Sequence, residues 1–326
     1  MLLFAATTVF ANDGIEKMLS EIKAISGYEK LEKADTTRSY YLLKFTQLID
    51  PNNAEVGTFE QRVMLGHRGT VIVTEGYGGD YAFGSKRYME ELTHILDANI
   101  LFVEYRFFSQ SKPEQLNWDY MTIANSMHDY HAITTAFKKY YTGKWASTGI
   151  SKGGSTTIFY RAYYPEDVDV SVPYVAPLSR SLEDGRHESF LEQASTKANR
   201  DAVRNFQYQL LERKAALLPM FNQYCLNKEY TFYVPTETIY DLCVLEYQFS
   251  FWQWGSPASE IPVATASDED VFKYFIRLCE PNYFSRKNDL ESFSVQAVKD
   301  FGYYGYNVDP FKDYINVEDI EGYYKK

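Results

Sequence analysis

A serine set between glycines is the residue whose type and surroundings best suit nucleophilic chemistry. Gly149 to Gly153 form the pattern G-x-S-x-G with Ser151 at the centre, after a short apolar run and before a stretch with helical potential. In such an order of strand, turn and helix, glycines let the backbone turn sharply without Cβ clashes and expose the serine above a parallel sheet. Ordinary glycine turns share the bare pattern, but its context favours Ser151 as a catalytic nucleophile.

An attacking serine needs hydrogen-bond donors for the oxyanion that forms on its substrate. The main-chain N–H of Lys152 directly follows the nucleophile and is the first expected donor. The second is expected from Gly76 or Tyr77, because the run Glu75–Gly79 follows the third predicted strand, where this architecture has its other donor. A plain glycine turn is the alternative interpretation of that run.

The general base is harder to find in this sequence. The expected chain order is serine, then Asp or Glu, then histidine. His187 is the one histidine after Ser151, and it stands at the start of a predicted helix instead of a loop after the last strand, so we do not expect it to be the base. His128 and His131 share a helix face, but no further metal ligand lies within sequence reach. We therefore expect a hydrogen-bonded helix there, and neither a metal nor another cofactor.

The elements that must position these residues alternate along the first half of the chain. The predicted helices are 15–34, 84–96, 121–141 and the stretch after Ser151, and the predicted strands are 39–49, 56–65, 70–74, 100–105, 145–150 and 167–175. Strands and helices joined by short connections predict an α/β fold with a doubly wound, mostly parallel sheet.

The second half has a different character. Its patterns are almost all helical, over 183–218, 236–254, 268–278 after a capping pair at Ser267 and Asp270, and 290–301. We expect a core at 12–180 and a helical cap at 181–326 that lies over the catalytic edge of the sheet.

The charge of the chain and its apolar N-terminus indicate which kinds of partner and which compartment to expect. The net charge is -11, from 33 basic and 44 acidic residues without a basic cluster, and this argues against nucleic acid or an anionic membrane as partner. The apolar run 1–11 is too short to span a bilayer and has a small residue, Ala11, where a secretory signal would be cleaved. It lacks a basic leader, so a partial signal peptide and a merely apolar N-terminus remain open. We favour an exported protein, secreted or periplasmic.

The three cysteines all lie in the second half of the chain. Cys225, Cys243 and Cys279 are odd in number, so they do not form a fully paired framework. A disulfide between Cys225 and Cys243 and a set of buried thiols are both compatible with the sequence.

Several motifs in one order resemble a known family. They are Thr74–Tyr77 (T-E-G-Y), Val103–Pro113 (V-E-Y-R-F-F-x-x-S-x-P), Trp145–Gly154 (W-x-x-T-G-x-S-K-G-G), and Tyr163–Asp184 with Y-Y-P-x-D-V-D, Y-V-A-P and E-D. Together they resemble the secreted serine peptidases of the prolyl tri- and tetrapeptidyl aminopeptidase type, and more distantly the lysosomal Pro-X carboxypeptidases and dipeptidyl peptidases. The resemblance is dense between residues 75 and 191.

The resemblance implies an α/β-hydrolase with a helical cap that hydrolyses short peptides through an acyl-enzyme on Ser151. It also implies Glu75, Glu104 and Arg106 as substrate-binding residues near the site, with bracing of the sheet as the alternative for the last two. Glu183 and Asp184 are expected to receive a free peptide N-terminus, since a buried ammonium needs a carboxylate.

The family's acid and histidine come from strands and loops beyond its cap, and this sequence reaches Lys326 without that section. We therefore expect a C-terminally incomplete member that does not complete a triad by itself.

Two other functions stay open at this point. One is a non-catalytic relative that binds peptides, and the other is an esterase or lipase on the same fold, which the polar, tyrosine-rich cap disfavours.

Overall fold

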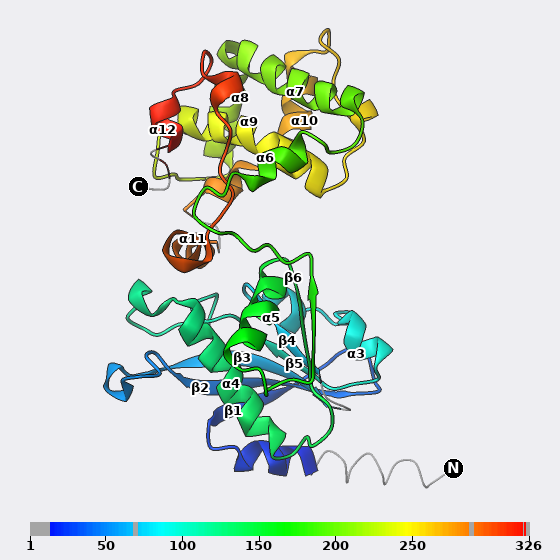
Figure 1. The fold of residues 1–326 in the computed structure, drawn as a ribbon, viewed down its shortest axis with the longest axis vertical. Helices are drawn as coiled ribbons and strands as arrows, with labels where there is room; N and C mark the ends of the chain where they lie inside the picture. Colours follow the sequence, from blue (N-terminus) through cyan, green and yellow to red (C-terminus); the bar gives the residue numbers. More distant parts are fainter. Residues whose placement is uncertain (1–13, 68–70, 287–289, 322, 324–326) are drawn as a thin grey trace. The chain divides into compact units, whose positions relative to one another are not determined.

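The computed structural model describes residues 14–67, 71–286, 290–321 and 323, and the chain folds as two compact units (Figure 1). The first unit comprises the residues up to Leu178 together with Ser292–Phe301, and the second comprises Ser179–Glu291 with the residues from Gly302 onward. Each unit is described by itself below.

A seven-stranded mixed sheet forms the first unit. Its strands are β1 (Ile25–Leu31), β2 (Ser39–Leu48), β3 (Thr58–His67), β4 (Val71–Thr74), β5 (Ile100–Val103), β6 (Ala146–Ile150) and β7 (Val170–Tyr174), in the order β1-β2-β3-β5-β4-β6-β7. The strands β5, β4, β6 and β7 run parallel, whereas β1, β2 and β3 pair antiparallel, as does β3 with β5. The predicted mixture of helices and sheet is therefore confirmed, but the sheet is only partly parallel, and its doubly wound arrangement stays a prediction. The first three strands are antiparallel because short connections join them, and a parallel pair needs a long crossover.

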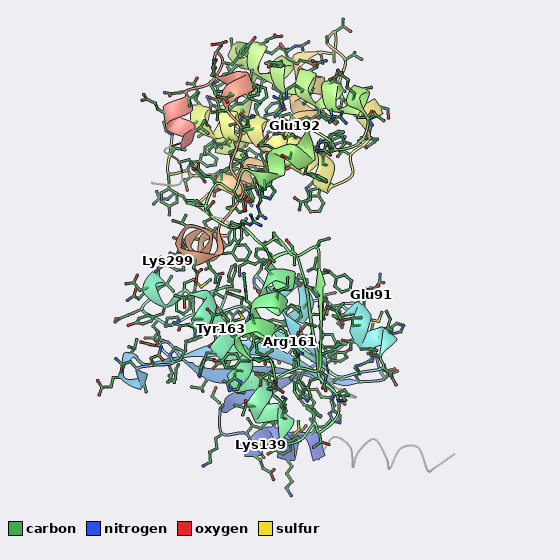
Figure 2. All side chains as sticks on the ribbon, in the orientation of Figure 1. Glu91, Lys139, Arg161, Tyr163, Glu192 and Lys299 are labelled. Carbon is green, nitrogen blue, oxygen red and sulfur yellow. The ribbon has the colours of Figure 1, made fainter. Side chains whose placement is uncertain are left out.

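Two long helices cover one face of this sheet (Figure 1). The helices of the unit are α2 (Asp80–Phe83), α3 (Glu91–Ile95), α4 (Ile123–Lys138) and α5 (Lys152–Tyr163), and α4 and α5 lie on the same face of the sheet in Figure 1. Helix α5 packs on β4, β6 and β7 and against α4. Arg161 and Tyr163, near the end of α5, are labelled in Figure 2.

Two predicted helices of the first unit are wrong in extent. The predicted helix 84–96 is divided, because Gly84 caps the end of α2 and Glu90 caps the start of α3, where its side chain accepts a hydrogen bond from the Thr93 N–H. The predicted helix 15–34 is helical only over 14–21, because residues from Ile25 onward pair with β2 as strand β1. Local periodicity is overridden there by strand pairing.

The second unit is helical, as the sequence predicts. It contains α6 (Arg186–Leu191), α7 (Lys197–Glu212), α8 (Lys214–Asn227), α9 (Thr236–Gln253), α10 (Asp268–Leu278) and α12 (Val317–Glu321), and no strand among its described residues. Helix α9 is buried along most of its length by the helices around it. Ser267 caps α10 by accepting a hydrogen bond from the Asp270 N–H, as predicted. All three cysteines are buried free thiols, so the disulfide alternative does not hold.

The segment 291–301 departs from the predicted boundary of the cap. It forms α11 (Glu291–Gln296) and the π-helical turn η5 (Ala297–Phe301), and from Ser292 onward it belongs to the first unit. The Ser292 hydroxyl donates to the Phe107 carbonyl (2.6 Å), and the Ile123 N–H donates to the Asp300 carboxylate (2.6 Å). Lys299, labelled in Figure 2, donates to the Trp118 carbonyl (2.9 Å). Polar contacts of this kind, between residues far apart in sequence, leave no periodic signal.

Candidate active site

Ser151 stands on a strained turn between β6 and α5. Its φ of 58° and ψ of -121° lie in a region that a residue with a Cβ seldom adopts. The turn is held on both sides, because the Ser151 N–H donates to the Tyr174 carbonyl at the end of β7 (3.0 Å) and the Ser155 N–H donates to the Ser151 carbonyl (3.0 Å). The side chain is half-buried. This is the geometry of a nucleophile elbow, in which strain keeps a serine at a fixed, accessible position.

Glycines allow two other segments to approach this turn closely. A Cβ on Gly154 would lie 2.6 Å from the Tyr174 carbonyl oxygen, and a Cβ on Gly76 would lie 2.6 Å from the Gly153 nitrogen and 2.7 Å from the Lys152 Cβ. All three distances are shorter than real Cβ atoms show. The run Glu75–Gly79 is therefore more than a glycine turn, since Gly76 places it directly against the elbow.

The expected oxyanion donors differ in availability. The Lys152 N–H belongs to the first residue of α5 and so has no acceptor within the helix. The Gly76 N–H instead donates to the Glu75 carboxylate (2.6 Å), which also accepts a main-chain hydrogen bond from Tyr77. Both loop amides named by the sequence are thus directed at Glu75 in this structure.

Glu75 braces the loop beside the elbow. Its side chain is buried and accepts a hydrogen bond from the Tyr81 hydroxyl in addition to the two loop amides. Burial raises the pKa of this carboxyl, although the hydrogen bonds from Tyr81 and the loop amides and the nearby Lys152 amine act in the opposite direction. The Tyr130 hydroxyl holds the main chain by donating to the Glu75 carbonyl (2.7 Å). These contacts make Glu75 a determinant of loop geometry.

The side chain of Lys152 points into an aromatic box. Its Nζ lies 3.3 Å from the centre of the Tyr105 ring and within 6 Å of the ring centres of Tyr77, Phe108 and Phe301. The residue is 1% exposed, and among the described residues Nζ has no hydrogen-bond partner. Burial lowers the pKa of this amine well below its usual value, and the charges of Glu75 and Asp300 oppose that shift.

Tyr77 extends from the loop toward the nucleophile. The ring forms edge contacts with Phe108 (centroids 5.9 Å apart) and a tilted contact with Phe293 (5.8 Å). The Tyr105 N–H donates to the Tyr77 carbonyl (3.1 Å), which fixes the main chain. Burial raises the pKa of the Tyr77 hydroxyl to about 12, and a hydrogen bond with the Ser151 side chain opposes this shift. The hydroxyl therefore stays protonated at neutral pH and faces the candidate nucleophile.

Glu104 and Arg106 are both fully buried and fully paired. The Glu104 carboxylate accepts hydrogen bonds from the Arg62 guanidinium, the Ser111 hydroxyl (2.6 Å) and the Gly79 N–H (2.7 Å). Arg106 donates twice to Asp129, at 2.7 Å each. Their described contacts are those of residues that brace the sheet and its loops, which was the alternative interpretation of the sequence.

Glu183 and Asp184 lie in the second unit and differ from each other. Asp184 is buried, pairs with the Arg186 guanidinium and accepts from the Arg180 N–H (2.8 Å), and these contacts lower its pKa. Glu183 is exposed and adopts a positive φ of 60°. His187 donates from Nδ1 to the Asp184 carbonyl (2.8 Å) and packs edge-on against Tyr304. Asp184 is therefore already neutralised, whereas Glu183 presents its carboxylate to solvent.

The histidines on α4 have structural partners. His131 contacts the Asp167 carboxylate (2.7 Å) and stacks on Tyr164, while Asp129 between them pairs with Arg106. His128 is packed edge-on against His131. Within the part of the chain that the structure describes, no group of three or more His, Cys, Asp or Glu is arranged to hold a metal.

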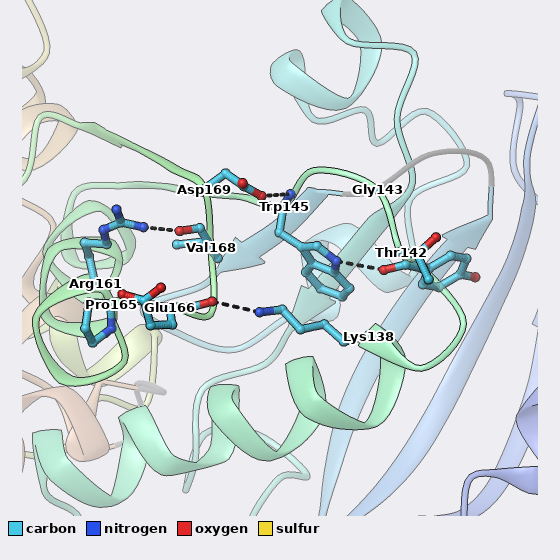
Figure 3. Close-up of a pocket in the computed structure, with 10 residues that line it drawn as sticks. Lys138, Thr142, Gly143, Trp145, Arg161, Pro165, Glu166, Val168 and Asp169 are labelled. Carbon is cyan, nitrogen blue, oxygen red and sulfur yellow. Dashed lines mark hydrogen bonds between the residues drawn. The ribbon is translucent and has the colours of Figure 1, made fainter.

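A separate polar cavity of about 510 Å³ lies at the other end of the parallel strands (Figure 3). It is bordered by the residues before β6 and β7, and Figure 3 shows Lys138 donating to the Glu166 carbonyl and Arg161 donating to the Val168 carbonyl. It contains none of the predicted site residues. The elbow, at the carboxyl ends of the strands, is thus distinct from this cavity.

Sequence reasoning missed the residues that enclose Lys152. Tyr105 is part of a quoted motif, but a motif alone does not indicate that its ring covers an amine. Phe301 and Gln296 come from the segment that returns to the first unit, and the Gln296 amide donates to the Tyr105 hydroxyl (2.9 Å). No pattern in the sequence indicates that these residues lie near Lys152.

One curated protein is similar to this chain over most of its length. Over 240 residues, 72% of this chain and 50% of the relative, it is 31% identical to the prolyl tri/tetrapeptidyl aminopeptidase of Streptomyces mobaraensis. The chain thus spans about half the length of that curated relative.

Among solved structures the likeness is loose. Rv0554 of Mycobacterium tuberculosis is 15% identical, with a TM-score of 0.34 over 77% of this chain and 76% of its own. A CocE/NonD family hydrolase of Staphylococcus aureus is 12% identical, with a TM-score of 0.36 over 54% of this chain and 36% of its own.

The family assignment rests on a much longer match than these structures give. Residues 11–275 match the PS-10 peptidase S37 family, and this range contains the elbow, the loop beside it and the aromatic residues around Lys152, apart from Phe301. The match covers most of the chain, and the identity to the curated aminopeptidase supports it independently. This chain belongs to the PS-10 peptidase S37 family of serine peptidases.

Proposed function

We propose that this chain carries the nucleophile-bearing part of an exported serine aminopeptidase that releases short peptides, tri- or tetrapeptides ending in proline among them. In this proposal Ser151 attacks the scissile carbonyl and forms an acyl-enzyme, which water then hydrolyses. The second unit is proposed to act as the helical cap that selects the peptide. The sheet, the elbow and the helix behind it are proposed to be those of an α/β-hydrolase.

The elbow is the observation that carries the proposal. A positive φ at a residue with a Cβ costs free energy, on the order of 1–3 kcal/mol, and persists where surrounding contacts enforce it. Here the main-chain hydrogen bonds of Ser151 to Tyr174 and Ser155 hold this conformation. Gly76 and Gly154 have no side chain, so the backbone of neighbouring segments can approach the turn closely. A structural turn has no need of such a strained serine, whereas a nucleophile gains a fixed, accessible hydroxyl.

Peptide selectivity is proposed from the relative that shares the sequence. That protein is named for the release of tri- and tetrapeptides at proline. An aminopeptidase must recognise the ammonium at the peptide's N-terminus, and the exposed Glu183 carboxylate is the proposed receptor. Asp184 is left out of this role because it is already paired with Arg186.

The triad's acid and base are proposed to come from the part of the relative that this chain does not span.

The described residues contain no helix long and apolar enough to cross a bilayer. The predicted leader at 1–11 lies outside the described residues. Export is therefore proposed from the sequence of that leader.

A fluorophosphonate, which phosphonylates only an activated serine, tests this proposal in the full-length protein. We expect labelling at Ser151, complete loss in Ser151→Ala, and retention in Ser155→Ala. Peptides with a free amine should be cleaved faster than the same peptides N-acetylated, and simple acyl esters should be poor substrates. Labelling without peptide cleavage would favour an esterase, and failure of the wild-type protein to label would favour a relative that binds peptides without cleaving them.

A further inference from the structure

The second oxyanion donor is the open question of the candidate site. The sequence points to the amides of Gly76 and Tyr77, but both are directed at the Glu75 carboxylate. That carboxylate is buried, and rotating either amide toward a substrate would remove one of its hydrogen bonds. A buried acceptor that loses its donor costs about 1–3 kcal/mol. The loop's main chain is therefore an unfavourable source of a donor.

The side chain of Tyr77 supplies a donor in the right position. Gly76 holds the loop against Gly153 and Lys152, so the side chain of the next residue starts at the elbow itself. Its ring packs against Phe108 and Phe293, and its hydroxyl lies close enough to the Ser151 side chain to interact with it. The residue is half-buried, and the packing of its ring fixes the side chain beside the elbow.

We propose that the phenolic hydroxyl of Tyr77, together with the Lys152 N–H, forms the oxyanion hole of this serine peptidase. When the Ser151 oxygen adds to the carbonyl carbon, the C=O π bond breaks and its electron pair moves to the carbonyl oxygen. Tyr77 donates a hydrogen bond to that oxygen without giving up its proton. The Ser151 proton passes to the general base, which the proposed function expects from the part of the relative that this chain does not span. That base gives the proton to the leaving amine when the C–N bond breaks and the tetrahedral intermediate collapses to the acyl-enzyme, while the Tyr77 proton stays on the phenol throughout.

Two features of the surroundings suit the hydroxyl to this task. The packed ring needs no reorganisation when the charge develops, and preorganised donors of this kind account for a large part of the catalysis of acyl transfer. The raised pKa keeps the phenol protonated across the pH range in which peptidases act. The Ser151 contact in the free enzyme is then exchanged for one with the substrate's oxyanion.

The inference rests on the proposed function, and Tyr77→Phe in the full-length protein tests it. The variant keeps the packed ring and removes one oxygen. We expect kcat for peptide hydrolysis, and the rate of fluorophosphonate labelling, to fall about 100- to 1000-fold, as when one oxyanion donor is removed, with KM changed by no more than about threefold. Tyr163→Phe, on the exposed side of α5, is the matched control and should behave as wild type.

A second variant series tests the hydroxyl without removing it. Replacing Tyr77 by 3-fluorotyrosine and 3,5-difluorotyrosine makes the donor progressively more acidic, and kcat measured at pH 6 should change in step with that acidity. A Tyr77→Phe enzyme with wild-type kcat, or a rate independent of fluorination, would overturn the role of the hydroxyl. If those results occur while Ser151→Ala abolishes labelling, the peptidase assignment survives and only this inference fails. A wild-type protein that is never labelled would overturn both.

Discussion

The amine of Lys152, the residue that follows the candidate nucleophile, lies 3.3 Å from the centre of the Tyr105 ring. The ring belongs to the loop after β5, and its hydroxyl is held by Gln296 from the segment that returns from the second unit. One buried side chain therefore links the elbow, the β5 loop and the returning segment. The amine has no hydrogen-bond partner among the described residues, so its main favourable electrostatic interaction is with the faces of the aromatic rings.

Replacing Lys152 by methionine should remove a pH dependence of stability. The folded-state pKa of the amine is lowered, so the unfolded chain binds its proton more readily. Wild-type stability should therefore rise with pH up to the usual pKa of 10.5 and be lost as pH falls, with a slope of up to about 1.4 kcal/mol per pH unit. Lys152→Met should lack this slope and be at least as stable at pH 7.

Urea unfolding of both proteins between pH 7 and 10 measures the effect. The difference between the two proteins is the relevant quantity, because tyrosines ionise in the same range and contribute equally to both. Parallel pH profiles would contradict a desolvated amine at this position. Lys152→Ala is a poorer choice, since it also leaves a cavity among the rings.

A methyl group at Gly76 should separate the loop from the elbow. The added Cβ would lie 2.6 Å from the Gly153 nitrogen, and that backbone has no room to move because it begins α5. We expect Gly76→Ala to destabilise the protein by about 1–3 kcal/mol, typical of overpacking, and to reduce labelling of Ser151. Gly143→Ala is the matched control, because nothing lies within 4 Å of its Cβ. Equal unfolding free energies for the two variants would refute the close approach.

The sequence predicted several elements well because their signals are local. The β-branched run of β4, the glycines of the elbow and the Ser267 cap each depend on neighbours a few residues away. It was less successful wherever pairing over a long distance decides the outcome. Strand β1 was taken for a helix, and the returning segment was assigned to the cap.

The same limit applies to the candidate site. The nucleophile and its flanking amide follow from the motif, but the direction of the Gly76 N–H depends on where the Glu75 carboxylate is buried. Likewise, the sequence cannot distinguish the paired Asp184 from the exposed Glu183, although the two are adjacent. Such differences arise from single side-chain contacts and leave no trace in composition or spacing.

Those two neighbouring carboxylates should respond differently to mutation. Glu183→Gln removes an exposed charge and keeps the side chain's size, so stability should change by less than about 0.5 kcal/mol. If Glu183 receives the substrate's ammonium, KM for peptides with a free amine should rise about tenfold, with little change for N-acetylated peptides. Asp184→Asn should instead lower stability, because it weakens the contacts to Arg186 and the Arg180 N–H. An equal loss for free and acetylated peptides would exclude Glu183 as the receptor.

The second unit should carry its own pH dependence through Glu246. This carboxylate lies on α9, is 8% exposed, and accepts hydrogen bonds from the Tyr304 (2.9 Å) and Tyr306 (2.8 Å) hydroxyls. Burial raises its pKa to about 7, although the tyrosine hydroxyls oppose the shift. A raised pKa in an acid means that the native state holds the proton more tightly than the unfolded chain does. The resulting stability is fully present below pH 4.5 and is lost as pH rises through 7, by on the order of 3 kcal/mol. Glu246→Gln keeps the shape without the charge, so its unfolding free energy should vary less between pH 5 and 8 and exceed that of the wild type at pH 8.

Thermal unfolding of both proteins between pH 5 and 8 measures this difference. We expect the wild type to lose stability relative to the variant as pH rises from 5 to 8. If it loses none, Glu246 remains ionised when buried.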